Sequence, residues 1–312
     1  MTIQDLLQRY GPKPSTENDP ESFQSNHSLR AFVHGREYFR ALDQDITQLT
    51  QSPTPEKYFY LAAWWLGLID ARAAFSIGPK ALSWKVNMTL RPMMLPKKRP
   101  LLDALKQMAE SGVDVRVLAW CDPYVPNVRK VAEQSGLLAV NLQTLLSVQA
   151  LRKTPQFANR VMLNTRCHSL GGAHTKLVVC GNQDSMRAYV SGIDPEPTRI
   201  EVNWHDVGVM VQGRAAKGCY DFYRNLWREQ REQKPLSFTV DKNTIVSHAK
   251  NYPEIPVRPA APPHPANQRP IHVQVLRTLP AMHFSPKGPQ QIPEANWVRS
   301  LLAKDSALMQ LA

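Results

Sequence analysis

The sequence has little cysteine, and its cysteines lie far apart. The four residues are Cys121, Cys167, Cys180 and Cys219, and no two of them form a Cys-x-x-Cys pair. Zinc knuckles need closely spaced pairs, and small secreted domains need a dense disulfide framework, so the pattern argues against both classes. We expect buried free thiols in a reducing compartment.

Long apolar segments are also missing. The first residues, MTIQDLLQRYGPKPSTENDP, lack the apolar core of a secretory signal. The strongest apolar run, YFYLAAWWLGLI at 58–69, is short of the ~20 residues that cross a bilayer, so we expect a buried strand there. The sequence therefore predicts a protein without a membrane span, either cytoplasmic or exported by a route that needs no signal peptide.

Acidic residues are outnumbered, with 26 Asp and Glu against 38 Lys and Arg, which gives a net charge of +12. Such a surplus favours anionic partners: nucleic acid, phospholipid headgroups or other phosphates. It does not choose among them. A hydrophobic fraction of 43% and a charged fraction of 21% are typical of globular chains.

The chain divides into four segments by composition. Residues 1–28 are polar and are expected to form a flexible lead-in. Residues 29–235 alternate short apolar runs with helical periodicity, which predicts an α/β domain with a parallel or mixed sheet covered by helices on both faces. Residues 236–270 form a proline-rich linker. Residues 271–312 contain one further strand and one helix, the incomplete start of a second half-domain.

Within the second segment, elements are predicted from periodicity and from turn residues. The predicted helices cover residues 36–50, 100–110, 141–153 and 214–232. The predicted strands cover residues 29–35, 58–69, 113–120, 159–165, 187–192 and 205–213, and one more follows His174. Trp64, Trp65 and Trp120 are assigned to the core, and the basic stretch Lys97, Lys98 and Arg99 to a solvated loop.

Three short motifs are expected to meet at one edge of this sheet. His174 and Lys176, in GGAHTKLVVC, lie two residues apart and therefore share one face of a strand. SGID (191–194) ends the next strand, and WHD (204–206) opens a third. Ligands of α/β proteins bind where strand ends converge. The alternative is a strand start whose polar pair simply faces solvent.

These residue types suit attack on a phosphodiester. A neutral imidazole at His174 is a nucleophile, and a cation at Lys176 attracts phosphate oxygens. Gly192 lets a ligand approach the backbone closely. A carboxylate at Asp206 can hold the imidazole of His174 in one tautomer.

The stretch 174–227 resembles the phospholipase D superfamily, whose signature is His-x-Lys, four residues, Asp, and then a Gly-Gly or Gly-Ser turn. The pieces FVHGREYFRAL, YLAAWWL, LLDALKQMAESGVDVRVLAW, WHDVGVMVQGRAA and IHVQVLRTLP are similar too and occur in the same order. The resemblance covers nearly all of residues 29–280. It implies a phospholipase D-like mixed sheet, with residues 29–235 as one His-Lys-Asp half and residues 271–312 as the beginning of a second.

The resemblance also implies roles. His174 would be the nucleophile or its acid–base partner, Lys176 would bind phosphate, and Asp206 would orient His174. Ser191, Gly192 and Asp194 would line the phosphate pocket. No metal and no cofactor are implied. Arg199 is either a phosphate contact or a surface ion pair.

The sequence departs from the family in three places. Gly181 stands where the signature has Asp, with Asp184 as a distant substitute. Ser191 replaces the first glycine of the turn. The family's active site uses two His-x-Lys motifs that face each other, and here we expect only one, so a partner chain, a second copy or a C-terminal half must complete the site.

We therefore expect a phosphodiesterase that hydrolyses or transfers phosphatidyl groups of phospholipids through a phosphohistidine, with peripheral membrane contact. Two alternatives stay open. One is a homodimeric nuclease, although nucleic acid is less favoured because the length and the linker fit it poorly. The other is a degenerate protein that binds phosphate or lipid without turnover, an alternative that Gly181 and the single motif motivate.

Overall fold

The computed structural model describes residues 28–72, 88, 90–122, 136–165, 167–168, 171–201, 205–240, 243–248 and 251–259. In this part of the chain, seven strands form one mixed sheet in the order β1-β9-β8-β7-β2-β3-β4. Their bounds are β1 (Leu29–Val33), β2 (Tyr58–Ala63), β3 (Asp114–Trp120), β4 (Val161–Asn164), β7 (Leu177–Gly181), β8 (Met186–Ser191) and β9 (Val207–Gln212). Strands β2, β3 and β4 are parallel, and the β7, β8, β9 and β1 pairings are antiparallel.

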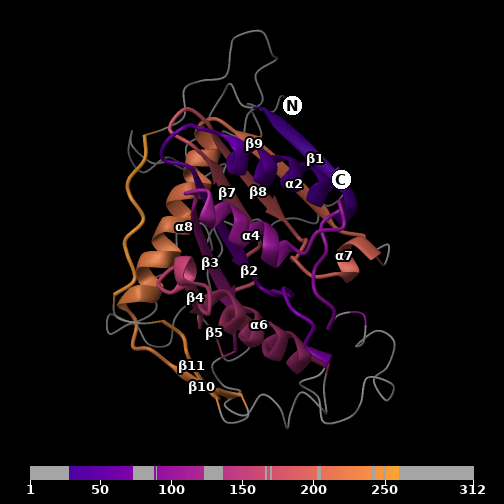
Figure 1. Cartoon of the computed structure of the whole chain (residues 1–312), viewed down its shortest axis with the longest axis vertical. Helices are drawn as coiled ribbons and strands as arrows, with labels where there is room; N and C mark the ends of the chain where they lie inside the picture. The colour runs from indigo at the N-terminus through magenta and orange to yellow at the C-terminus, as the bar shows by residue number, and fades with distance from the viewer. Residues whose placement is uncertain are drawn as a thin grey trace, which may run out of the picture.

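Helices cover both faces of the sheet (Figure 1). The bounds are α2 (Gly35–Gln51), α4 (Leu101–Glu110), α6 (Gly136–Arg152), the 3₁₀ turn η3 (Pro155–Phe157), α7 (Thr198–Glu201) and α8 (Arg214–Glu232). Helices α2, α4 and α6 lie on one face and α8 on the other. The predicted fold class, a mixed sheet flanked by helices, is confirmed. None of the helices in the described ranges is both long and apolar enough to cross a membrane.

The two faces of β2 show why this sequence forms a central strand. Phe59 and Leu61 point to the largely aliphatic core under α2 and α4, whereas Tyr58 and Tyr60 point to an aromatic core under α8. Every residue of β2 is buried. A strand buried on both faces has a continuous apolar sequence, so the strand itself was predictable. Which of its residues face which core was not.

Strand β2 ends at Ala63, six residues before the predicted end at Ile69. The cause is a set of hydrogen bonds from other parts of the chain. The backbone N–H groups of Trp64 and Trp65 donate to Asp194 Oδ1 at 3.2 and 2.9 Å. Leu66 and Leu68 then donate to side-chain hydroxyls of α6. These bonds draw the chain out of the sheet. Helix α6 begins at Gly136, earlier than the predicted Asn141.

The described part of the predicted linker packs against the domain. Residues Ser237–Val240 (β10) and Asn243–Val246 (β11) form an antiparallel hairpin. Beyond it, Tyr252 and Ile255 are buried in the aromatic core, and Pro253 O accepts hydrogen bonds from Arg116 and Trp227. Within residues 251–259 the prolines therefore mark a closely packed strap and not an open connection. Residues 1–27 and 271–312, which contain the predicted lead-in and second half, lie outside the described residues.

Candidate active site at the sheet edge

The register of the sheet gathers the predicted site residues at one edge. Leu177, which follows Lys176, pairs with Ala62 on one side and with Val190 on the other. Ser191 pairs with Gly208. The residues before β7, after β8 and before β9 therefore meet at the edge where β2 and β3 also end. A two-residue ladder, β5 (Cys167–His168) with β6 (Gly171–Gly172), immediately precedes the His174 segment.

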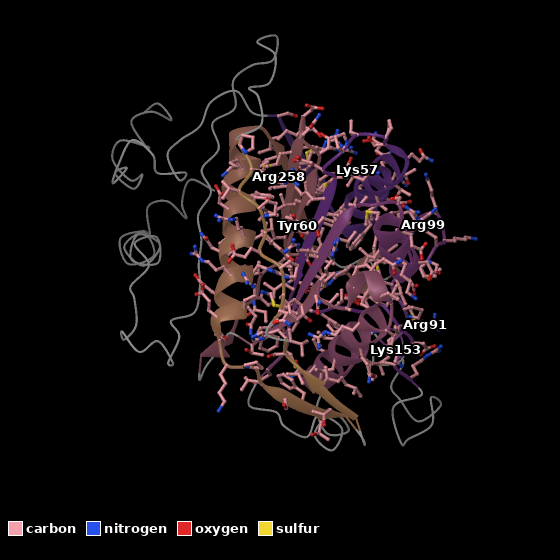
Figure 2. The ribbon with its side chains drawn as sticks, turned by 60° about the vertical axis from the view of Figure 1, so that its left-hand side comes forward. Lys57, Tyr60, Arg91, Arg99, Lys153 and Arg258 are labelled. Atoms are coloured by element: carbon pink, nitrogen blue, oxygen red, sulfur yellow. The ribbon has the colours of Figure 1, made fainter. Side chains whose placement is uncertain are left out.

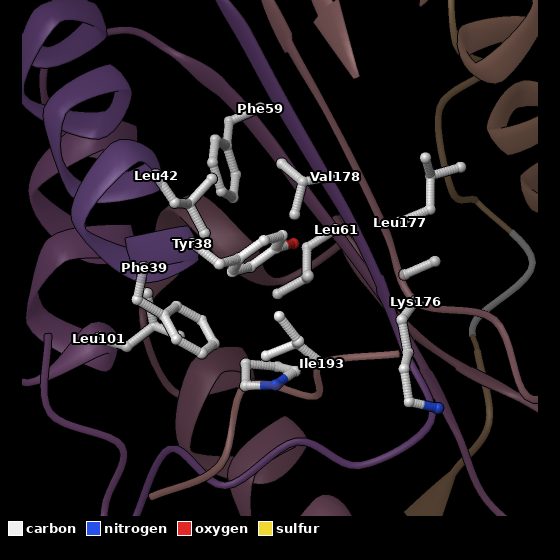
Figure 3. Close-up of a pocket in the computed structure, with 12 residues that line it drawn as sticks. Tyr38, Phe39, Leu42, Phe59, Leu61, Leu101, Lys176, Leu177, Val178 and Ile193 are labelled. Carbon is white, nitrogen blue, oxygen red and sulfur yellow. The ribbon is translucent and has the colours of Figure 1, made fainter. Parts of the chain in front are cut away.

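Lys176 is held by a buried carboxylate. Its Nζ lies 3.2 Å from Asp194 Oδ2, and the exposed fractions of the two side chains are 3% and 0%. The lysine stem also lines a small apolar cavity with Tyr38, Leu61 and Ile193. Figure 3 shows the Lys176 amine directed away from these apolar side chains. Because the amine is buried and paired, its position is fixed before any ligand arrives.

His174 is the exposed partner of this lysine. Its Nε2 lies 3.0 Å from Lys176 Nζ, and its side chain is exposed to solvent. An ammonium group has donors only, so Nε2 accepts this hydrogen bond and the ring proton of a neutral imidazole resides on Nδ1. The geometry places the lone pair of Nε2 beside a cation at the mouth of the site.

The electrostatics keep this imidazole neutral. Partial burial lowers the pKa of His174 below its usual 6.5, and the charges of Lys176 and Arg199 lower it further, against the opposing charge of Asp206. Burial also lowers the pKa of Lys176, although the nearby carboxylate of Asp194 opposes this. A neutral imidazole is the form that can act as a nucleophile near pH 7.

Arg199 ties together three carboxylates of the site. Its Nη1 donates to Asp206 Oδ2 at 2.8 Å, its Nε lies 2.8 Å from Glu196 Oε1, and its Nη2 lies 3.9 Å from Asp194 Oδ2. Its guanidinium is about nine-tenths buried. The sequence offered a phosphate contact or a surface ion pair for Arg199. The structure shows neither: Arg199 forms buried ion pairs with carboxylates of the site. Gly35, the first residue of α2, packs against its backbone, where a Cβ would lie 2.2 Å from Arg199 O.

Asp206 lies at the expected edge with a different partner. The hydrogen bond that the structure shows for its carboxylate comes from Arg199, and its Oδ1 would lie 2.4 Å from a Cβ at position 192. Only a glycine at position 192 therefore leaves room for the Asp206 carboxylate where it lies. The negative charge of Asp206 acts to raise the pKa of His174. Orientation of the imidazole by this carboxylate stays a prediction.

The other predicted pocket residues take supporting positions. Asp194 has no exposed surface, and desolvation raises its pKa against the opposing charge of Lys176. Ser191 Oγ accepts the N–H of Ile193 at 3.2 Å and shapes the turn. Direct contact of Ser191, Gly192 or Asp194 with a substrate stays a prediction.

Sequence reasoning missed Glu196 and misplaced Trp64. Glu196 is buried and forms an ion pair with Arg199. In the sequence it lies in the stretch DPEP between two strands, and this pattern alone did not indicate a buried residue. Trp64 was assigned to the core, yet it is half-buried. Its ring lies 4.7 Å from the His174 ring, edge to face, and 5.2 Å from Lys176 Nζ. It forms one wall of the site because β2 ends one residue earlier.

Gly181, which replaces the signature Asp, is at the opposite end of β7. It pairs with Tyr58 and Met186, far from the Leu177 end. A Cβ at this position would lie 2.0 Å from the backbone oxygen of Ser185, so the turn excludes any side chain. Asp184, the proposed substitute, is exposed on this turn. It is therefore not a site residue, because it lies at the wrong end of the strand.

The expectation of a single His-x-Lys triplet is wrong, because His248-Ala249-Lys250 is a second one, without the glycine turn that follows the first. The imidazole of His248 is buried, and its Nδ1 lies 3.0 Å from Ser247 Oγ. Burial lowers its pKa, against hydrogen bonds to the backbone of Gln233 and Arg231. It lacks the exposure of His174 and is satisfied internally, so we assign it to the packing of β11 against the domain.

The described ranges contain no group of three or more His, Cys, Asp and Glu side chains placed to bind a metal ion. The edge instead offers an exposed neutral imidazole, a fixed ammonium, and a guanidinium among carboxylates. Such a set can perform nucleophilic catalysis, with the cation close to the charge that develops on the attacked group.

No family model matches the chain, and no curated protein sequence matches it. Solved structures do show similarity. NucT from Helicobacter pylori shares 13% identity over 65% of this chain and 96% of its own, with a TM-score of 0.39. The phosphatidylserine synthase of Haemophilus influenzae Rd KW20 shares 14% sequence identity over 73% of this chain and 41% of its own, with a TM-score of 0.38. Nuc from Salmonella typhimurium, at 11% identity over 65% and 95% with a TM-score of 0.37, is a member of the phospholipase D family, which the motifs around His174 resemble.

Proposed function

We propose that this chain is a phospholipase D-type phosphodiesterase that hydrolyses or transfers phosphatidyl groups. The observation that carries the proposal is the pairing of the exposed residue His174, through its Nε2, with the buried Lys176 Nζ at 3.0 Å. The pairing leaves the imidazole neutral and keeps a cation within reach of any phosphate that the imidazole attacks.

The reaction proceeds in two displacements. His174 Nε2 gives up the hydrogen bond from Lys176 Nζ, its freed lone pair attacks phosphorus and forms an N–P bond, and the P–O bond to the leaving alcohol breaks. The leaving oxygen takes a proton from an acid of the second half. Water, or an acceptor alcohol, then attacks the phosphohistidine and releases the product, and its proton returns to that same group. Lys176 keeps its ion pair with Asp194, and the N–H that it donates to Nε2 in the free site is donated to a phosphate oxygen as negative charge collects there.

The second half is supplied by a partner chain, another copy or a C-terminal segment. An exposed aliphatic surface next to the site supports this. Val33, Val190 and Val207, from neighbouring strands, have exposed fractions of 60%, 43% and 67%. Three valines at the ends of adjacent strands form the kind of patch that protein contacts cover. Their end of the sheet is also the end that carries His174.

The substrate experiment incubates the purified chain with phosphatidylcholine vesicles, and separately with single-stranded and duplex DNA. Release of choline supports the proposal, whereas cleavage of DNA alone would replace it with the nuclease alternative. Acid-labile, base-stable phosphate on His174, found after rapid quench, identifies the intermediate.

The matched variant is His174→Ala. Because the side chain is exposed, the fold should be unaffected, and turnover should fall by at least about a thousand-fold. His205→Ala, an exposed histidine at the same edge, is the control for nonspecific loss of an imidazole. Full turnover by His174→Ala would end the mechanism.

A second candidate function, binding of phosphate or lipid without turnover, is favoured by one observation. The two cations of the site, Lys176 and Arg199, already face three carboxylates, so little net positive charge is left for a phosphate dianion. Vesicle binding with neither choline release nor DNA cleavage, in the presence of every candidate second half, would favour this function.

A further inference from the structure

A basic groove borders α7, the short helix that carries Arg199, and none of the predicted site residues lines it. We define it by α2, the loop of residues 94–98 and α7, which enclose about 440 Å³. This volume falls within the ~300–1,000 Å³ of small-molecule sites. Helix α2 packs against α7 (Figure 1), and α7 carries Arg199, so the groove and the site share one wall.

Two cations of the groove have no ion-pair partner among the described residues. Arg36 and Lys98 are exposed, and both line it. The third cation, Arg40, is bound to Glu37 at 2.5 Å. The one carboxylate in the lining, Glu201, lies 4.0 Å from Arg91. Arg36 and Lys98 are therefore available for an anion.

The structure divides the basic stretch that the sequence placed in a solvated loop. Arg99 donates to Asp43 Oδ1 at 2.5 Å and stabilises the fold. Lys97 and Lys98 are exposed. Figure 2 shows Arg91 and Arg99 on the side of the molecule away from Arg258 and α8. Of the three cations in this stretch, Arg99 therefore stabilises the fold, whereas Lys97 and Lys98 face solvent.

The floor of the groove is aliphatic. The partly exposed Met94, Pro96 and Ile200 form it above the buried Leu95, and no residue lining the groove is aromatic. Sites that bind single-stranded nucleic acid stack bases on aromatic rings, whereas a lipid needs aliphatic surface below a charged rim. The chemistry of the lining therefore fits an anionic amphiphile better than a polynucleotide.

We infer that this groove binds an anionic phospholipid, with the phosphate between Arg36 and Lys98 and the hydrocarbon on Met94, Pro96 and Ile200. Binding there would hold the sheet edge against a lipid surface and present His174 to neighbouring headgroups. The inference rests on the proposed function only for this last step, since binding itself requires no turnover.

The test measures co-flotation of the full chain with phosphatidylcholine vesicles, with and without about 30% phosphatidylglycerol. Wild type should bind the anionic vesicles and not the neutral ones. Arg36→Gln/Lys98→Gln should weaken this binding by roughly ten- to thirty-fold. The matched control is Arg228→Gln/Lys234→Gln, which removes the same charge from exposed positions on and after α8 and should bind within about two-fold of wild type.

Two further arms identify the ligand. Short-chain phosphatidylglycerol should compete more strongly than glycerol phosphate, because only the lipid contacts the aliphatic floor. Met94→Ser/Ile200→Ser should remove that preference. The inference is overturned if the groove variant binds vesicles as wild type does, if glycerol phosphate competes equally, or if the groove variant loses binding to a single-stranded oligonucleotide but not to lipid.

Failure of the proposed function would be visible separately. His174→Ala should float with anionic vesicles as wild type does, because His174 is not among the residues that line the groove. A chain that binds vesicles but never releases a headgroup leaves this inference standing and removes the catalytic proposal. A chain that turns over phosphatidylcholine without selective binding to anionic vesicles supports the catalytic proposal and removes this inference.

Discussion

The two ends of strand β7 both lie near buried carboxylates, but those carboxylates are used differently. At the Leu177 end, Asp194 holds Lys176, and an exposed His174 lies on the far side of that lysine. At the Gly181 end, Asp45 of α2 accepts hydrogen bonds from Arg187 and from Tyr189 Oη. The second arrangement joins a helix to the sheet. The first leaves a reactive group facing solvent.

This difference bears on the missing signature Asp. Gly181 is five residues along an extended strand from Lys176, and therefore about 17 Å away. At that distance, its side chain would not touch a phosphate bound at His174. The departure from the family at position 181 changes a turn that supports the fold, and the groups that would perform chemistry are at the other end.

The largest expected effect is on stability at the site end. Lys176→Met removes the main partner of a fully buried Asp194, and an uncompensated buried charge costs about 3–5 kcal/mol of unfolding free energy. Asp45→Asn should cost less, about 1–2 kcal/mol, because Arg187 is partly exposed and can be solvated. Urea unfolding followed by circular dichroism gives both values.

The double variant Lys176→Met/Asp194→Asn is the control for this comparison. It should recover more than about 1 kcal/mol relative to Lys176→Met, because the buried charge is then gone. If Lys176→Met cost less than Asp45→Asn, the site end would not depend on its ion pair, and the contrast between the two ends would be lost.

The same substitution at one glycine from each end sharpens the comparison. Gly181→Ala places a Cβ 2.0 Å from the backbone of Ser185, which cannot yield easily, so we expect a loss of about 2–4 kcal/mol. Gly192→Ala meets the movable carboxylate of Asp206 at 2.4 Å. It should cost less than about 1 kcal/mol, yet lower turnover by about ten-fold or more, because Asp206 is displaced.

Thermal unfolding and steady-state rates of the two glycine variants separate stability from activity. The expected result is an unstable but active Gly181→Ala and a stable but impaired Gly192→Ala. The reverse pattern would place the functional end of β7 at Gly181.

The pH dependence of turnover tests the state of the exposed imidazole. Burial and the neighbouring cations lower the pKa of His174 below 6.5. The nucleophile is deprotonated above that pKa, so the rate should be retained at pH 6.5 and lost only at more acidic pH. The acid limb of kcat/KM, together with the NMR titration of the His174 ring, gives the midpoint. A midpoint above 6.5 would mean that Asp206 dominates over Lys176 and Arg199.

Local pattern was enough to predict most of the fold. Helix α8 and strand β3 lie within one residue of their predicted bounds, because their periodicity and turn residues are local signals. The end of β2 was not predictable. It depends on bonds to Asp194, about 130 residues away. The strap of residues 251–259 was likewise hidden, since proline content indicates an extended backbone and not what the backbone packs against.

The same limit applies to the site. The motifs predicted which strand ends meet, and the register brings His174, Lys176 and Asp206 to one edge. Which group binds which was not in the pattern. Lys176 holds Asp194, and Arg199 holds Asp206 and Glu196, because a buried charge must find a counter-charge wherever the fold provides one. Trp64 joins the site only because β2 ends early.

The smallest effect is expected at Asp184, the residue that sequence reasoning offered in place of the signature Asp. Its side chain is exposed on the turn after β7, and the turn is held by Asn182 Oδ1, which accepts the N–H groups of Asp184 and Ser185 at 2.9 Å. Asp184→Ala should therefore change unfolding free energy by less than about 0.5 kcal/mol and turnover by less than about two-fold. Asn182→Ala, which removes those acceptors, should cost about 1 kcal/mol or more. A large loss of turnover in Asp184→Ala, with stability unchanged, would show that the far end of β7 reaches the chemistry after all.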